Sequence, residues 1–238
     1  PDETLRITQE LYEKKMVTYP RTDARVLSTA VAKEIRRNLS GLKNFGAVGG
    51  FAQEILDKKA DLSLIKSRYV NDKQITDHYA IIPTGQGIAN LRNLNGTAAG
   101  VYELICRRFL SIFYPPAVYQ KIALEMERKT EHFFSNFRLL LEEGYLKVAG
   151  NTQTSKKDEE EQDIKNDPAF LELLRKVKKN DILAIRDLYV KEGETSPPKR
   201  YNSGSLILAM ENAGQLIEDE ELRAQIKGSG IGTSATRA

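Results

Sequence analysis

The chain has 238 residues, 40% of them apolar and 29% charged, with 36 Lys and Arg against 33 Asp and Glu. The apolar fraction excludes a wholly disordered chain, and no run of about 18 apolar residues is present that could span a membrane. A single cysteine, Cys106, excludes an internal disulfide framework and indicates a reducing, cytoplasmic compartment, while two histidines leave little for a metal site.

The two halves of the chain differ in charge, and its first residues do not read as a natural start. Residues 1–120 hold 17 basic against 12 acidic side chains, whereas the remainder holds 19 against 21. A mildly basic half permits a polyanionic partner without requiring one. The opening sequence PDETLRITQELYEKK carries neither an initiator Met nor a signal-peptide pattern, so we expect a piece of a longer polypeptide.

The first half of the chain is predicted to be helical, because its apolar residues recur at helical spacing in three stripes. The stripes are Leu5, Ile7, Leu11 and Tyr12, then Val31, Ile35 and Leu39, then Val101, Leu104, Ile105 and Ile112. Residues 19–20 and 67–87 lack this period and contain Pro20 and Pro83. We therefore expect two loops over a helical scaffold.

A boundary is expected at the Tyr-Pro-Pro sequence of residues 114–116, after which the apolar period changes from about 3.6 to about 2. From Val118 to Met126 apolar residues alternate with charged ones, as in a strand with one face exposed. We predict an antiparallel sheet, with strands at residues 118–127, 134–141, 145–149 and 182–190.

Residues 151–163 contain KKDEEEQD and almost nothing to bury, so we expect a mobile connection, followed by a short helix at 167–179. A second helix is predicted after residue 201. Its apolar face holds Leu206, Met210, Ala213 and Ile217, and its N-cap is Asn202 or Ser203. The glycines at 228, 230 and 232 then lead into TSATRA, a pattern typical of a glycine loop that opens a helix.

Several common catalytic motifs are absent. The sequence has no GxxxxGK[ST], and its closely spaced glycines miss the third position of GxGxxG, which argues against a nucleotide-driven motor. It also has no HExxH, CxxC or GxSxG. Any catalysis here requires a different nucleophile.

The string VTYPRTD at residues 17–23 offers one. Tyr19 is held by Pro20, and Arg21 places a planar guanidinium, which suits a phosphate, near the phenol. A phenol with a pKa of about 10 needs proton removal or phenolate stabilisation before it can attack a phosphodiester. The structural alternative is an ordinary Tyr-Pro turn in which Arg21 pairs with Asp23.

VTYPRTDARVLS resembles the active-site segment of type IA DNA topoisomerases. Other stretches agree with that family in order along the chain, from about Thr4 to the last residue. They are LYEKK, DHYAIIPT at residues 77–84, a YxxIxxRFL-type helix ending at residues 114–116, and SPPKRYNSGSLILAMENAG leading to GIGTSATRA. The DHxAIIPT and GIGTxATRA forms are more similar to the bacterial topoisomerase III branch than to topoisomerase I.

The resemblance implies a role for each matching residue. Tyr19 would be the nucleophile that cleaves one DNA strand and keeps its end as a 5′-phosphotyrosine, without ATP. Arg21 would grip the scissile phosphate, Asp23 would support Arg21, and His78 would contact phosphate or help to place protons. Among these motifs, Ala24 stands where many members have Ser, and Tyr79 where many topoisomerase III proteins have a second His.

The resemblance also implies a strand-binding segment near the end of the chain. There the amides at a helix N-terminus and nearby hydroxyl groups would hold the DNA backbone. The implied DNA-binding residues are Gly230, Gly232, Thr233, Thr236 and Arg237, and Ser234 stands where Pro is usual.

The family's N-terminal metal-binding domain does not precede Tyr19 in this sequence. The resemblance implies that this missing domain of the same polypeptide binds Mg²⁺ in the intact enzyme, so no metal or other cofactor is expected in this chain. We therefore expect the chain alone to be inactive. The alternative function is a non-catalytic module for single-stranded nucleic acid, in which Tyr19 only stacks on a base.

The fold class expected from the pattern and the resemblance is α+β and multidomain. Residues 1–118 would form a mainly helical gate domain with the active-site tyrosine, 119–200 part of an antiparallel β arch, and 201–238 the start of a helical strand-binding domain. The expected partners are single-stranded DNA and the missing metal-binding domain, with no membrane. The expected location is the cytoplasm, at the nucleoid, and the oligomeric state stays open.

Overall fold

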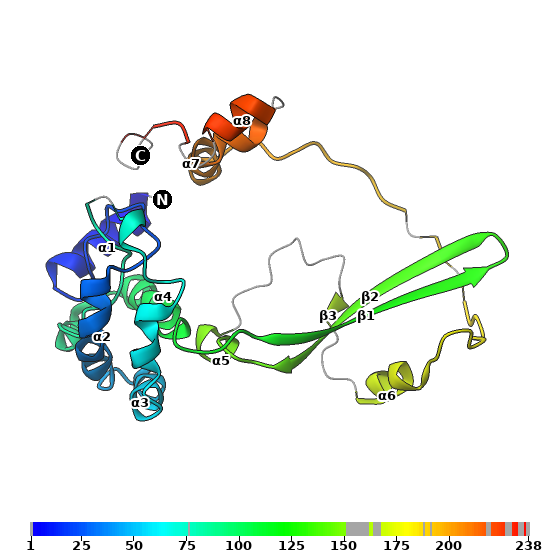
Figure 1. Ribbon diagram of the computed structural model, residues 1–238, viewed down its shortest axis with the longest axis horizontal. Coiled ribbons are helices and arrows are strands. Elements are labelled where there is room, and N and C mark those ends of the chain that lie inside the picture. The colour runs from blue at the N-terminus through cyan, green and yellow to red at the C-terminus, as the bar shows by residue number, and fades with distance from the viewer. Residues whose placement is uncertain are drawn as a thin grey trace. The chain divides into compact units, whose positions relative to one another are not determined.

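The computed structural model describes residues 2–75, 77–150, 162–163, 168–187, 189–190, 192–217, 220–226, 230–232 and 236 (Figure 1). The chain divides into two compact units. The first, here the helical unit, contains residues 1–116, 144–150 and 201–238, and the second, here the hairpin unit, contains residues 117–143 and 151–200.

The helical unit begins with the helices that the apolar stripes predicted. They are α1 (Asp2–Glu13), α2 (Thr29–Leu42) and α4 (Gly96–Ser111). Sequence reasoning missed α3 (Gly49–Asp57), a nine-residue helix that starts with two glycines and is too short to show a clear stripe. Three 3-10 turns, η1 (Ala60–Lys66), η2 (Asp72–Gln74) and η3 (Ile88–Asn93), connect these helices.

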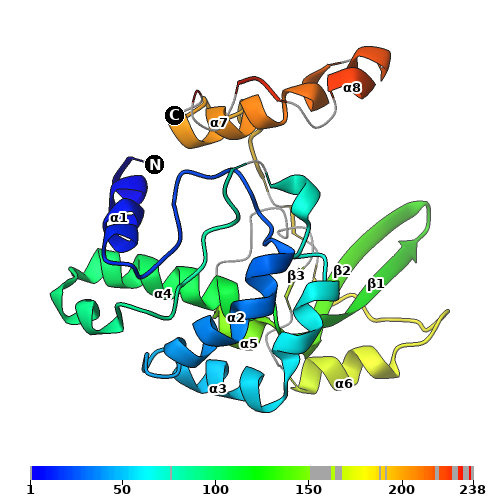
Figure 2. The same ribbon diagram turned by 60° about the vertical axis from the view of Figure 1, so that its left-hand side comes forward.

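The core of the helical unit lies between these helices. Helix α1 packs against α4, and α2 packs against α3 and η1 (Figures 1 and 2). Leu11, Leu39, Tyr102 and Leu110 are fully buried there. The predicted stripes thus face the core, except for Tyr12 on α1 and Leu104 on α4, which are exposed.

Glu54 on α3 joins three parts of the helical unit. Its carboxylate accepts hydrogen bonds from Lys58 at 2.7 Å, from the Tyr114 hydroxyl at 2.8 Å and from Lys147 at 3.1 Å. These donors, Lys58 first, lower the pKa of Glu54 to about 2. Glu54 therefore ties the segment after α4, and the residues that return from the hairpin, to α3.

The hairpin unit is built on two long antiparallel strands, β1 (Val118–Arg128) and β2 (Glu131–Glu142), which Figure 1 shows as an extended ribbon. Their register runs from Val118 opposite Glu142 to Arg128 opposite Glu131, and Lys129 turns with a φ of 58°. The predicted antiparallel pair is confirmed. A third short strand, β3 (Gln162–Asp163), pairs with β2 in parallel, and α6 (Pro168–Lys176) confirms the predicted short helix.

The strand predicted at residues 145–149 is wrong, because the chain there forms the short helix α5 (Leu146–Ala149). Gly144 turns out of β2 with a φ of 48°, and the Tyr145 amide donates to the Pro115 carbonyl at 2.9 Å. Val148 is then fully buried, and α5 packs against α4. Val148 is therefore buried against a helix, and residues 145–149 do not pair as a strand.

The strand predicted at residues 182–190 is also wrong. The described residues of this segment form no strand, and Ile182 and Val190 are 99% and 91% exposed. The β-branched composition suits a strand, but none of the described strands pairs with this segment. The mobile connection predicted at 151–163 lies outside the described residues, apart from β3.

The last part of the helical unit begins with α7 (Ser203–Glu211), as predicted. Asn202 is its N-cap and accepts from the Ser205 amide at 2.8 Å, while the Ser205 hydroxyl accepts from the Asn202 amide at 2.9 Å. The single long stripe predicted through residue 217 is broken, because the chain changes to the 3-10 turn η5 (Ala213–Leu216) before α8 (Glu220–Ile226). Across the described residues, none of the helices has the length and apolar character needed to cross a membrane.

Candidate active site

Two sequence motifs about 60 residues apart lie alongside each other in the helical unit. Val17 and Pro83 form an antiparallel bridge, and the Thr18 amide donates to the Ile82 carbonyl at 3.0 Å. The Thr18 hydroxyl donates to the Ala80 carbonyl at 3.2 Å and accepts from the Ile82 amide at 2.9 Å. The VTYPRTD and DHYAIIPT segments, here the two motif loops, are therefore joined along their backbones.

The end of α1 delivers the first motif loop to this position. After Glu13, Lys15 adopts a φ of 59°, and the Met16 amide donates to the Leu11 carbonyl at 2.9 Å. Met16 and Val17 are buried in the core. Pro20 is buried as well, so Tyr19 stands half-buried between two anchored positions.

A close approach of two glycines fixes the second motif loop against α2. A Cβ on Gly41 of α2 would lie 2.0 Å from the Gly85 carbonyl oxygen, and a Cβ on Gly85 would lie 2.5 Å from that of Asn38. Gly85 also has a φ of 74°, which favours glycine. The Asn38 side chain donates to the Pro83 carbonyl at 2.9 Å. The loop is thus held to the helix at backbone distance.

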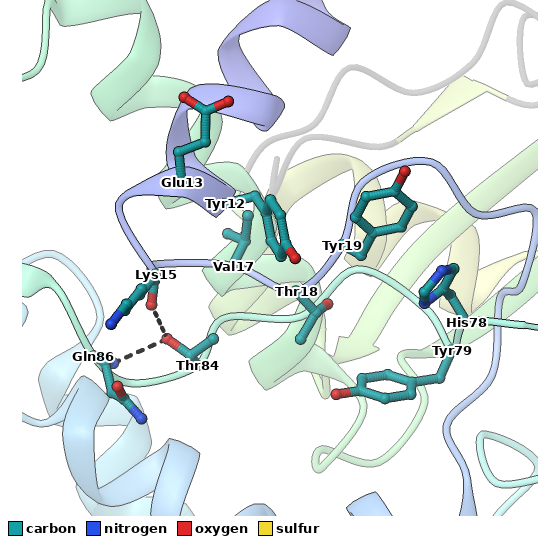
Figure 3. Close-up of a pocket in the computed structure, with 10 residues that line it drawn as sticks. All are labelled: Tyr12, Glu13, Lys15, Val17, Thr18, Tyr19, His78, Tyr79, Thr84 and Gln86. Atoms are coloured by element: carbon teal, nitrogen blue, oxygen red, sulfur yellow. Dashed lines mark hydrogen bonds between the residues drawn. The ribbon is translucent and has the colours of Figure 1, made fainter.

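Helix α1 and the two motif loops place three neighbouring rings in the lining of a pocket of about 600 Å³ (Figure 3). The ring centroids of Tyr19 and His78 are 4.4 Å apart, and those of Tyr12 and Tyr19 are 5.4 Å apart in an edge-to-face arrangement. Such spacings are typical of interacting aromatic pairs. The two residues that the motifs singled out, Tyr19 and His78, are therefore neighbours despite their separation in sequence.

The floor of the pocket is fixed by Thr84. Its amide donates to the Met16 carbonyl at 2.9 Å, and its hydroxyl donates to the Lys15 carbonyl at 2.6 Å and accepts from the Gln86 amide at 3.1 Å (Figure 3). These bonds close the loop around the left-handed residue Lys15. They make the pocket a product of backbone geometry as well as of side chains.

Arg21 and Asp23, which follow Tyr19 in the first motif loop, are exposed. Within the part of the chain that the structure describes, Arg21 forms no ion pair with Asp23 or with another carboxylate. The Thr22 hydroxyl between them donates to the His78 carbonyl at 3.0 Å. Arg21 is therefore available to an anion, and the turn in which Arg21 pairs with Asp23 is not formed.

Sequence reasoning missed the threonines that position this site. Thr18, Thr22 and Thr84 all bridge the two motif loops, or the loop and the end of α1, through side-chain hydrogen bonds. The signal was present, because each threonine is part of a quoted motif. Their partners are backbone groups distant in sequence, which the motif alone does not identify.

The carboxylates of this pocket do not fit a bound Mg²⁺. Glu13 is the one acidic residue among those that line it, whereas Mg²⁺ requires several oxygen ligands in octahedral geometry. Among all described residues, no group of three metal-ligating side chains is present. Lys15 and His78 are the basic groups of the lining, and they suit an anion instead.

The predicted strand-binding residues fall only partly within the structure. Gly230 and Gly232 follow α8, and Gly232 has a φ of 72°, as expected in a glycine turn. Thr236 is exposed. Thr233 and Arg237 lie outside the described residues.

Comparisons with known proteins point in one direction. A family profile described as DNA topoisomerase matches residues 1–238. The chain is 36% identical to DNA topoisomerase 3 of Bacillus licheniformis and 34% identical to that of Bacillus subtilis, over 99% of this chain and 31% of each relative. DNA topoisomerase 3 of Shouchella clausii is 36% identical over the same shares. The chain thus spans about a third of the length of these curated relatives.

Proposed function

The chain belongs to the type IA DNA topoisomerase family, and from this premise we propose that it is the part of such an enzyme that carries the nucleophile, Tyr19. The enzyme would cleave one strand of DNA, let another strand pass and rejoin the first. We propose the topoisomerase III branch, in agreement with the names of these relatives.

In the proposed step, the phenolic oxygen of Tyr19 attacks a backbone phosphorus and loses its proton. A bond forms between this oxygen and phosphorus, and the bond between phosphorus and the 3′ oxygen breaks, so the 3′ hydroxyl leaves with a proton. The DNA end stays attached as a 5′-phosphotyrosine. One phosphodiester replaces another, so the reverse attack rejoins the strand without ATP.

Three residues near Tyr19 have proposed roles in this step. Arg21 would hold the scissile phosphate with its guanidinium and stabilise the charge that develops on it. Asp23 would orient Arg21 once DNA is bound. His78 would contact the phosphate or move a proton, which imidazole can do near neutral pH.

The observation that most supports this proposal is the 4.4 Å approach of the Tyr19 and His78 rings. It is produced by the paired motif loops, and Arg21, two residues after Tyr19 in the chain, has no ion-pair partner among the described residues. A nucleophile, a titratable group and a cation for phosphate are the components that phosphoryl transfer requires.

We also propose a domain organisation, a set of DNA-binding residues and a location for the enzyme. Residues 1–118 would form the gate domain, 119–200 part of the β arch and 201–238 the start of the strand-binding domain, with Gly230, Gly232, Thr233, Thr236 and Arg237 on the DNA backbone. Mg²⁺ would be held by residues outside this chain, and the chain alone would not cleave DNA. The site of action would be chromosomal DNA in the cytoplasm.

The test is an adduct assay with labelled single-stranded DNA and Mg²⁺. It compares this chain alone with the chain joined to a family metal-binding domain, each with Tyr19→Phe and Tyr12→Phe variants. We expect a covalent adduct in the joined protein only, lost in Tyr19→Phe and kept in Tyr12→Phe, which removes a hydroxyl from the same pocket.

An adduct that survives Tyr19→Phe would contradict the assignment of the nucleophile. An adduct with the chain alone would contradict the proposed division of labour between domains. Binding of single-stranded DNA without any adduct in the joined protein would favour the alternative, a non-catalytic module in which Tyr19 stacks on a base.

A further inference from the structure

A second pocket lies within the helical unit, and its lining shares no residue with the pocket of Tyr19. It has a volume of about 340 Å³, at the small end of the range for ligand sites. Three segments distant in sequence converge on it: the loop after η1 supplies Arg68 and Tyr69, the end of α4 and the residues after it supply Arg108 and Tyr114, and the start of α5 supplies Tyr145.

The lining of this pocket is cationic. Two arginines contribute to it, and no Asp or Glu does. Arg107, the residue before Arg108, pairs with Glu103 at 2.7 Å and donates to the Val148 carbonyl at 2.9 Å. Arg108 has no such partner among the described residues. One arginine of this pair therefore serves the fold, while the other is left to face solvent or a ligand.

Glu54, a carboxylate that contacts this lining through Tyr114, is already paired with two lysines. Glu54 accepts from the Tyr114 hydroxyl, but Lys58 and Lys147 lie 2.7 Å and 3.1 Å from its oxygens. Arg68 donates to the Tyr69 hydroxyl at 3.1 Å, and it forms no ion pair with a carboxylate of the described residues. The positive charge of the two arginines is therefore not cancelled by the groups around them.

The aromatic part of the lining complements this charge. The guanidinium carbon of Arg68 lies 5.1 Å from the centroid of the Tyr69 ring, within the range of a cation–π contact. Burial, followed by the hydrogen bond to Glu54, raises the pKa of Tyr114, so its phenol stays neutral. Tyrosine rings next to arginines are a common surface for nucleobases, because every base can stack on them.

We propose that this pocket binds one nucleotide unit, with its phosphate on Arg108 and Arg68 and its base against the tyrosine rings. The guanidinium fork matches two phosphate oxygens, and the absence of a carboxylate in the lining removes the repulsion that an anion would meet. The site does not depend on Tyr19 as a nucleophile. The nucleotide can be a free monophosphate or one unit of a single strand, because both present the same phosphate and base.

The test is isothermal titration calorimetry of the 238-residue chain with dTMP, thymidine and the octanucleotide (dT)8. We expect dTMP to bind and thymidine to bind at least about tenfold more weakly, because the charge-assisted hydrogen bonds to phosphate are lost. Arg108→Gln and, independently, Arg68→Gln should each weaken dTMP binding about tenfold. Arg37→Gln, an exposed arginine on α2 that lines neither pocket, is the control and should leave the affinity unchanged.

Two results would overturn the proposal. One is equal weakening of dTMP binding by Arg37→Gln and Arg108→Gln, which would indicate general electrostatic attraction. The other is equal affinity for thymidine and dTMP. Competition identifies the source of the nucleotide. If (dT)8 displaces dTMP, and if this displacement is lost in Arg108→Gln, the pocket binds one unit of a strand. If (dT)8 does not displace bound dTMP, the pocket binds a free nucleotide. Tyr19→Phe should change neither affinity for dTMP nor its dependence on Arg108, so failure here is separate from failure of the proposed chemistry.

Discussion

Leu39 of the helical unit and Leu141 of the hairpin unit differ in how far their side chains are buried. Leu39 of α2 is 0% exposed, whereas Leu141 of β2 is 54% exposed. The core of the helical unit includes Val17 and Ile82 from the two motif loops, so packing there fixes the site. The hairpin is held chiefly by its backbone ladder. The position of Tyr19 therefore depends on packing within one unit, and changes in the strands should not disturb it.

The largest expected effect on the free energy of unfolding comes from a comparison of leucine-to-alanine substitutions, one in each unit. Leu39→Ala removes a fully buried side chain and should lower the free energy of unfolding by about 2 to 5 kcal/mol. Leu141→Ala should change it by less than about 1 kcal/mol, because this side chain is more than half exposed. Urea unfolding followed by the helical circular dichroism signal measures both. Similar decreases in the free energy of unfolding in the two variants would contradict this difference between the helical unit and the hairpin unit.

A smaller effect is expected where the second motif loop meets α2. Gly85→Ala places a Cβ 2.5 Å from the Asn38 carbonyl oxygen at a left-handed φ of 74°, and should destabilise the fold by about 1 to 3 kcal/mol. The control is Gly100→Ala on α4, where a Cβ meets open space. That change should stabilise the helix by about 0.5 to 1 kcal/mol.

Chemical denaturation of both glycine variants checks this prediction. If Gly85→Ala were neutral, the close contact between loop and helix would not be important for stability. A chemical shift change at Tyr19 and His78 in Gly85→Ala, absent in Gly100→Ala, would show that the contact of the second motif loop with α2 affects the site.

The smallest effect is a pH dependence at Glu54, which ties α5 to α3. Its pKa is lowered from 4.5 to about 2 when the chain folds, by Lys58, Tyr114 and Lys147. The stabilisation is therefore complete above about pH 4.5 and is lost as the pH falls towards 2. Because the lysines are on the surface, we expect Glu54→Gln to cost only about 1 to 2 kcal/mol at pH 7.

Urea unfolding between pH 3 and pH 7 checks the contribution of Glu54. The difference between wild type and Glu54→Gln should shrink as the pH decreases below 4.5. Glu34→Gln is the control, since Glu34 is exposed on α2 and has no ion-pair partner among the described residues. A difference at Glu54 that stays constant over this range would show that the hydrogen bonds of the neutral side chain, and not its charge, hold α5.

Sequence patterns predicted the elements that bury a regular face. The stripes through Leu11 and Leu39 predicted α1 and α2, and the alternation after Val118 predicted β1. The patterns failed where tertiary contacts decide. Val148 packs on a helix instead of a strand, and Ile182 lies in a β-branched stretch that finds no partner strand among the described residues.

The site was predictable to the extent that it is local. The motifs singled out Tyr19, Arg21 and His78, and the structure brings the first and third together. The threonine bridges and the approach of Gly85 to α2 were not predicted, because they join groups more than 40 residues apart in sequence. No local period or propensity carries that information.

The most direct test of whether Tyr19 is the nucleophile is to map the residue that becomes attached to DNA. A labelled oligonucleotide would be incubated with the chain joined to a family metal-binding domain, the adduct digested with protease and nuclease, and the modified peptide sequenced by mass spectrometry. The account predicts a nucleotide joined through its 5′ phosphate to Tyr19. Attachment to Tyr12 or another tyrosine, or linkage through a 3′ phosphate, would contradict it.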